Sequence, residues 1–223
     1  MATIDASKAG YITGQSSRIF ATARQNGSSV VSAPTNDQAA LQYTAVPGRG
    51  SLTHAMRRTF LYFDTSGLTG TISNTSLNIV GAGGDTADVI VLKSTAFGGD
   101  GGTTLATSDF FSTIDFSTAY SSEYASWDAS GTNDITLNST ANTDIQNDDA
   151  FICAIVEHDK DYSNTAATSG TALNAGIGFG TTITLTYTEA SSGYANDVIG
   201  VATANIGEVL GVATANIGKV IGI

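Results

Sequence analysis

Charged residues are scarce in this sequence: they make up 13% of its 223 residues, about half of the share usual in globular proteins. Threonine, serine, asparagine, alanine and 25 glycines take their place, a composition typical of short strands joined by tight turns. The net charge is −11, and basic residues cluster only at Arg57 and Arg58, so a nucleic acid is excluded as a partner.

Residues suited to catalysis are also few. The chain has two histidines, His54 and His158, and neither a G-x-S-x-G nor an H-E-x-x-H motif. Its one cysteine, Cys153, lies in the apolar run "FICAIV", which predicts a buried thiol and allows no internal disulfide. We therefore expect no enzymatic activity, with a glycosidase that uses distant carboxylates as the open alternative.

Long apolar runs are missing. No charge-free apolar stretch reaches about 18 residues, so we expect no membrane insertion. The first residues, "MATIDASKAG", lack a basic region followed by an apolar one, so we also expect no signal peptide and synthesis in a cytoplasm.

Strand patterns dominate what is present. Short segments rich in β-branched and aromatic residues are bounded by Gly, Asn, Asp or Ser at 57–66, 75–84, 88–95, 134–140, 150–159, 175–180 and 182–190, with weaker candidates at 10–23 and 39–46. This spacing predicts an all-β fold, a jelly-roll-like β-sandwich over residues 1–190. One short helical turn is expected within 138–148, capped by Ser or Thr and with Ile145 facing inward.

The segment "EHDKDYSN" is the only candidate metal site. In an extended strand Glu157, Asp159 and Asp161 would share a face and could bind calcium together. The segment lacks the central glycine and closing glutamate of a twelve-residue calcium loop. A solvated strand end is the favoured interpretation, and calcium is the one cofactor that we consider.

Six aromatic residues lie between 109 and 131, among Ser, Asp and Glu rather than aliphatic residues. Tyr120, Tyr124 and Trp127 have the most loop-like surroundings. Exposed rings there would stack on sugar faces, and the neighbouring polar groups would bind hydroxyls. Packing at the sandwich edge is the favoured alternative.

Three parts of the sequence resemble known families. The run "RRTFLYFDTSGLTGTISNTSLNIVGAGGDTADVIVLKS" resembles DNRLRE-type jelly-roll modules, with a basic-aromatic strand that ends in Phe-Asp. The section from "DFSTAY" to "NAGIGFG", which contains "WDASGTNDITLN" and "DKDYSN", is similar to structural proteins of tailed bacteriophages. The terminal repeat "VIGVATANIGEVLGVATANIGKVIGI" resembles short repeats of phage tail and fibre proteins. The resemblance implies a non-enzymatic β-sandwich on the outside of a virion, and it carries over no catalytic residue.

The C-terminal segment "VIGVATANIGEVLGVATANIGKVIGI" repeats an eleven-residue phrase. Its glycines and β-branched residues disfavour a helical supercoil, and Asp197, Glu208 and Lys219 disfavour a membrane helix. We therefore predict a strand–turn–strand tail over 191–223 that packs against other copies. The contact residues expected are Val198, Ile199, Val201, Ile206, Val209, Leu210, Val212, Ile217, Val220 and Ile221.

Together these observations predict a virion structural protein of a tailed phage, acting as a fibre, decoration or receptor-facing component. Its expected partners are further copies of itself, most simply a homotrimer, other virion proteins and a host-surface glycan. The alternative is a carbohydrate-binding module that recognises a polysaccharide through the aromatic loop.

Overall fold

In the computed structural model, which describes residues 1–190, 208–209 and 212–213, the chain is an all-β sandwich with few helices. Its strands are β1 (Ala2–Asp5), β2 (Lys8–Gly14), β3 (Gly27–Ser32), β4 (Asp37–Pro47), β5 (Leu52–Asp64), β6 (Thr71–Asp85), β7 (Val89–Ser94), β8 (Ile114–Ala119), β9 (Thr132–Thr136), β10 (Ala150–Glu157), β11 (Thr171–Ile177) and β12 (Thr184–Ala190). Its helices are α1 (Phe20–Gln25), α2 (Asp109–Ser112), α3 (Ser139–Asn147), the 3₁₀ turn η1 (Phe97–Gly99) and the π-helical turn η2 (His158–Tyr162).

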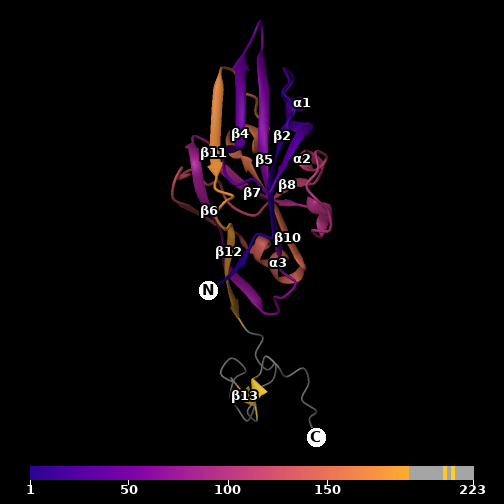
Figure 1. Cartoon of the computed structure of the whole chain (residues 1–223), viewed down its shortest axis with the longest axis vertical. Helices are drawn as coiled ribbons and strands as arrows, with labels where there is room; N and C mark the ends of the chain where they lie inside the picture. The colour runs from indigo at the N-terminus through magenta and orange to yellow at the C-terminus, as the bar shows by residue number, and fades with distance from the viewer. Residues whose placement is uncertain (191–207, 210–211, 214–223) are drawn as a thin grey trace.

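Every strand pairing in the body is antiparallel, and β5 and β6 each pair with three other strands. Strand β5 lies near the middle of the sheet order. It pairs with β4 along its first half, and with β2 and β10 on its two sides along its second half. The order from edge to edge is β1-β12-β6-β11-β4-β5-β10-β7-β8, with β3 beside β2 and β9 beside β6. The β4–β5 hairpin projects at one end of the body, and β1 and β12 lie toward the other (Figure 1).

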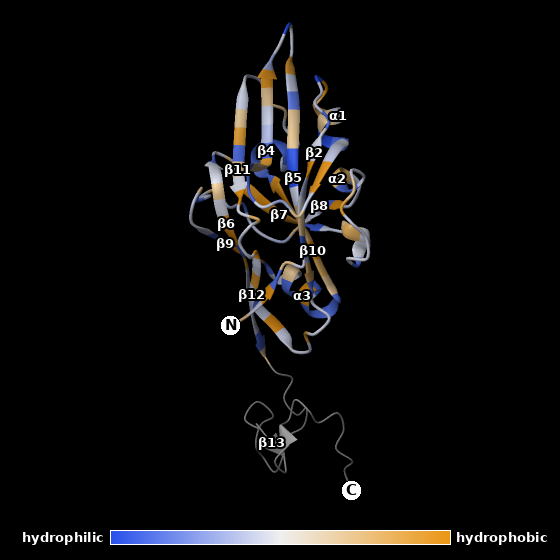
Figure 2. Ribbon diagram, in the orientation of Figure 1, coloured by the Kyte–Doolittle hydropathy of each residue, from blue (hydrophilic) through white to orange (hydrophobic). Residues whose placement is uncertain are grey.

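Strand β10 is buried on both faces, and this divides the interior into two hydrophobic cores. Phe151, Cys153 and Ile155 face the first core, which is closed by β6, β9, β12 and α3. The alternate residues Ile152, Ala154 and Val156 face the second core, which is covered by the segments around α1 and α2. Figure 2 shows the resulting hydrophobic colouring along β10 and the banded colouring of β5.

The predicted all-β fold is confirmed, and the last strand of the body ends at Ala190, where we place the boundary. The expected helix is present as α3, and Ile145 is fully buried, but its N-cap is Asn138, whose side chain accepts a hydrogen bond from the Ala141 N–H. The strand expected at 10–23 is half wrong: β2 ends at Gly14 and the chain then forms α1, which places Phe20 against the second core.

The described part of the C-terminal repeat is a short antiparallel pair, β13 (Glu208–Val209) and β14 (Val212–Ala213). Val209 lies opposite Val212, and Glu208 lies opposite Ala213. These four residues are therefore paired strands, and the remainder of the predicted strand–turn–strand tail lies outside the described residues. The other eight predicted contact residues, and Lys219, lie outside the described residues.

Gly81 marks a close contact between β6 and the loop that follows Trp127. A Cβ atom added at this glycine would lie 1.9 Å from the backbone oxygen of Asp128, whereas one added at Gly67 would meet nothing within 4 Å. We predict that Gly81→Ala lowers the free energy of unfolding by about 1–3 kcal/mol, because the backbone must move apart. Gly67→Ala should change it by less than about 1 kcal/mol. Urea unfolding of both variants measures the difference, and equal stabilities would contradict the contact.

Candidate functional site

The most elaborate polar arrangement in the described residues forms where β10 ends. Glu157, its last residue, is fully buried, and its carboxylate accepts the backbone N–H groups of Asp159 at 2.8 Å, Lys160 at 2.9 Å and Asp161 at 3.0 Å. These bonds satisfy the first turn of η2. Burial raises the pKa of Glu157, and the three N–H groups partly oppose this rise.

Asp161 points from this turn into the second core, where it meets Arg58 of β5. The Arg58 guanidinium donates to both carboxylate oxygens, at 2.7 and 2.6 Å, and both side chains are completely buried. Its remaining donors reach the backbone oxygens of Phe110 and Arg24. Four hydrogen bonds therefore hold the buried guanidinium, two of them to the opposite charge of Asp161.

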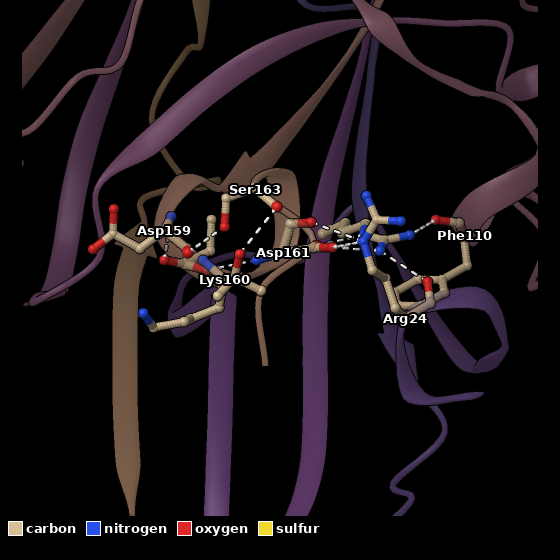
Figure 3. A network of polar contacts seen from close by, with 9 residues as sticks. Arg24, Phe110, Asp159, Lys160, Asp161 and Ser163 are labelled. Atoms are coloured by element: carbon tan, nitrogen blue, oxygen red, sulfur yellow. Dashed lines mark hydrogen bonds and ion pairs between the residues drawn. The ribbon is translucent and has the colours of Figure 1, made fainter. Parts of the chain in front are cut away.

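Arg24 of α1 adds a second cation to the pair. Its Nε donates to the Asp161 backbone oxygen at 2.8 Å and lies 3.3 Å from the carboxylate. Burial lowers the pKa of Arg24, and the charge of Asp161 opposes this change. The carboxylate thus faces two guanidinium groups, and Figure 3 shows it pointing toward them.

Aromatic rings enclose the two arginines. The Arg58 guanidinium lies 4.1 Å from the centre of the Phe110 ring, and that of Arg24 lies 4.2 Å from the centre of Phe116. Such cation–π contacts strengthen when water is excluded. The network joins α1, β5, the α2–β8 segment and η2, and its buried position assigns it to the stability of the fold.

The predicted calcium site at Glu157, Asp159 and Asp161 is not formed. The prediction required an extended strand, but the chain turns into η2 at His158, and alternate residues no longer share a face. Glu157 and Asp161 are buried with their own partners, while Asp159 points the opposite way from Asp161 (Figure 3). The favoured alternative, a solvated strand end, is also wrong for Glu157 and Asp161.

The predicted sugar-binding rings are packed rather than exposed. Tyr120 is 2% exposed and Trp127 is 6% exposed, and Tyr124 is partly buried and meets the Trp127 ring edge-on at 6.5 Å. The Tyr120 hydroxyl donates a hydrogen bond to Asp144 at 2.6 Å, and burial raises the pKa of Tyr120. The three residues therefore do not form a stacking platform, and the packing alternative is confirmed for Tyr120 and Trp127.

Cys153 and His54 are both buried, and burial sets their protonation. Burial raises the pKa of Cys153 to about 12, so its thiol is protonated at neutral pH and is a core side chain, as predicted. His54 is buried in the second core, and its Nδ1 lies 2.9 Å from the Tyr43 hydroxyl. That hydroxyl also accepts the Ala167 N–H, and burial lowers the pKa of His54, which favours a neutral imidazole.

The carboxylates Asp148 and Asp149 line an open groove together with Asp64 and Asp100. Hydrogen bonds from Ser66 lower the pKa of Asp64, which keeps it ionised rather than suited to donate a proton.

A separate cluster of Glu123, His158 and Asp159 was not predicted from the sequence, because Glu123 lies 35 residues before His158 in the chain. Their ligand atoms all lie within 4.8 Å of one another.

No helix in the described residues is both long and apolar enough to cross a membrane. No known family model matches the sequence, and no curated protein matches it either.

The adjacent residues Arg58 and Arg57 provide a matched test of the buried network. Arg58→Gln leaves the Asp161 charge buried and poorly paired, so we expect a loss of about 3–5 kcal/mol in the free energy of unfolding. Arg57→Gln removes a partly exposed pair with Asp37, 3.3 Å apart, and should cost about 1 kcal/mol or less. Chemical denaturation measures both. A loss at Arg58 no larger than that at Arg57 would contradict the role of the network.

The neutral state of His54 predicts a dependence of stability on pH. Burial lowers its pKa in the folded chain, so below about pH 6.5 the unfolded chain binds more protons than the folded one. The free energy of unfolding should therefore fall as the pH is lowered from 7.5 to 5.5. His54→Asn keeps an acceptor for Tyr43 and should reduce this fall. If denaturation curves show the same fall in both proteins, His54 is not its source.

Proposed function

We propose that this chain is a non-enzymatic structural protein of an assembled particle, a virion component of a tailed phage. In this proposal the β-sandwich is the presented body, and the C-terminal repeat attaches it to further copies or to other virion proteins. The role is that of a fibre, decoration or receptor-facing component.

The observation that carries the proposal is the separation of the two ends of the body. β1 pairs with β12 in register from Ala2 opposite Tyr187 to Asp5 opposite Thr184. The last strand therefore ends beside the N-terminal strand, and the repeat is joined to the body at that end (Figure 1). The β4–β5 hairpin lies at the far end, which suits a body attached at one end and presented at the other.

Charge also differs along the chain. Six of the nine lysines and arginines lie between residues 6 and 63, but only one of the twenty acidic residues, Asp37, lies there. These residues form β2, β3, β4 and β5, which include the presented hairpin. An end with few carboxylates would not repel a negatively charged cell surface, although the whole chain is acidic.

The interior supports a structural role rather than catalysis. Arg24, Arg58 and Asp161 are buried in the second core, and the thiol of Cys153 is buried in the first. A substrate therefore has no access to these groups. The alternative function, a carbohydrate-binding module acting through the aromatic loop, loses its support because Tyr120 and Trp127 are buried.

Assembly through the repeat is tested by substitutions in the full chain. We expect the unmodified protein to be oligomeric, most simply trimeric, and the double variant Val209→Asp with Val212→Asp to be monomeric. The introduced carboxylates would have to be buried in the contact between copies. Light scattering with size-exclusion chromatography gives the mass of each protein.

Thr203→Ser and Thr214→Ser alter polar positions of the same repeat and serve as controls that should remain oligomeric. A chain ending at residue 190 should be monomeric as well. A monomeric unmodified protein would reject assembly through the repeat. Electron microscopy of antibody-labelled particles tests the virion assignment separately, since unlabelled particles would reject it even if the protein oligomerises.

A further inference from the structure

We infer that Glu123, His158 and Asp159 form a surface site for a divalent transition metal, with Zn²⁺ as the ion that fits best. The three residues come from two segments, the loop between β8 and β9 and the start of η2. His158 Nδ1 lies 3.6 Å from a Glu123 carboxylate oxygen and 3.4 Å from an Asp159 carboxylate oxygen. This inference is independent of the proposed function.

The separations suit ligand atoms around an ion. Zn²⁺ binds imidazole nitrogen and carboxylate oxygen at about 2.0–2.2 Å, so neighbouring ligand atoms of a tetrahedral site are about 3.3–3.6 Å apart. Both nitrogen–oxygen distances fall in this range. The contact between His158 Nδ1 and Asp159 is a long hydrogen bond at 3.4 Å, whereas such bonds are usually about 2.7–3.2 Å long.

The backbone fixes the two segments relative to each other through the start of β7. Tyr124, next to Glu123, exchanges hydrogen bonds with Val89 at 2.8 and 3.1 Å, and the His158 N–H donates to the Asp88 oxygen at 2.8 Å. The His158 ring also stacks on Tyr162, with centroids 5.5 Å apart. The ligands are thus positioned on one rigid frame, which reduces the ordering cost of binding an ion.

The choice of ligands selects the class of metal. One imidazole with two carboxylates suits Zn²⁺ and neighbouring transition metals, whereas Ca²⁺ requires six to eight oxygen ligands. The site therefore differs from the calcium site predicted from sequence in two of its three residues and in its ion. Asp159 is the only residue that they share.

Other soft or nitrogen ligands in the sequence are not accessible. The chain contains one cysteine and two histidines in total. Cys153 is fully buried, and His54 is buried with its Nδ1 hydrogen-bonded to the Tyr43 hydroxyl. An imidazole-bound metal on the folded protein must therefore use His158.

The site is open to solvent on one side. The side chains of His158, Glu123 and Asp159 are 25%, 41% and 49% exposed. An ion can enter without a change in fold. The fourth position of a tetrahedral Zn²⁺ would be taken by water or by a group of a neighbouring molecule, as in zinc sites with three protein ligands.

Calorimetric titration of the full chain with ZnCl₂ tests the site. We expect one Zn²⁺ per chain, no binding at this site in His158→Asn, and at least tenfold weaker binding in Glu123→Gln and in Asp159→Asn. Asp85→Asn removes the same charge from an exposed residue outside the site and should bind as the unmodified protein does. Melting curves without metal establish that each variant is folded.

Nuclear magnetic resonance provides a second measurement, because the two histidines give two sets of imidazole signals. Zn²⁺ should shift the Nδ1 signal of His158 and leave His54 unchanged. Absence of Zn²⁺ binding, unaltered binding by folded His158→Asn, or binding without a shift of the His158 signals would each overturn the inference. Equal binding by Glu123→Gln and the unmodified protein would remove Glu123 from the site.

Discussion

The ion pair between Arg58 and Asp161 is the constraint on which the second core depends. Both side chains are completely buried, and a buried charge without a partner would cost several kcal/mol. The guanidinium is satisfied only when α1, the α2 segment and the turn after β10 are all in place. Correct assembly of these distant segments is thus linked to the placement of one positive charge.

The turn after β10 shows how this constraint shapes the surface as well. Glu157 accepts three successive backbone N–H groups, which bends the chain at the end of the strand and turns Asp161 inward. The same bend leaves His158 and Asp159 on the outside, beside Glu123. The buried network and the exposed cluster are therefore two consequences of one turn.

Most of the strands could be predicted from the sequence alone, but the turn after β10 could not. The run "FICAIV" predicts a buried strand because every residue is apolar, and β10 confirms it. The two-residue periodicity fails beyond Glu157, at both Asp159 and Asp161, because it applies only while the chain stays extended and the chain turns into η2 at His158. Arg58 and Asp161 are 103 residues apart in the chain, and Glu123 and His158 are 35 residues apart. These residues meet because β10 pairs with β5 and with β7, and the sequence does not reveal those pairings.

The aromatic loop illustrates a second limit of sequence reasoning. Serine and alanine around Tyr120 and Trp127 suggested exposure, but large rings next to small residues also fill the space between a sheet and a loop. In the structure the Tyr120 ring packs 5.0 Å from Phe151 of β10, so the loop closes the first core. Tyr120 and Trp127 are buried, so the aromatic loop offers no stacking platform, whereas the Glu123–His158–Asp159 cluster is at the surface. The buried Arg58, Asp161 and Glu157 are held by partners within the protein, so these charged groups serve the fold, in keeping with the presented body that we propose.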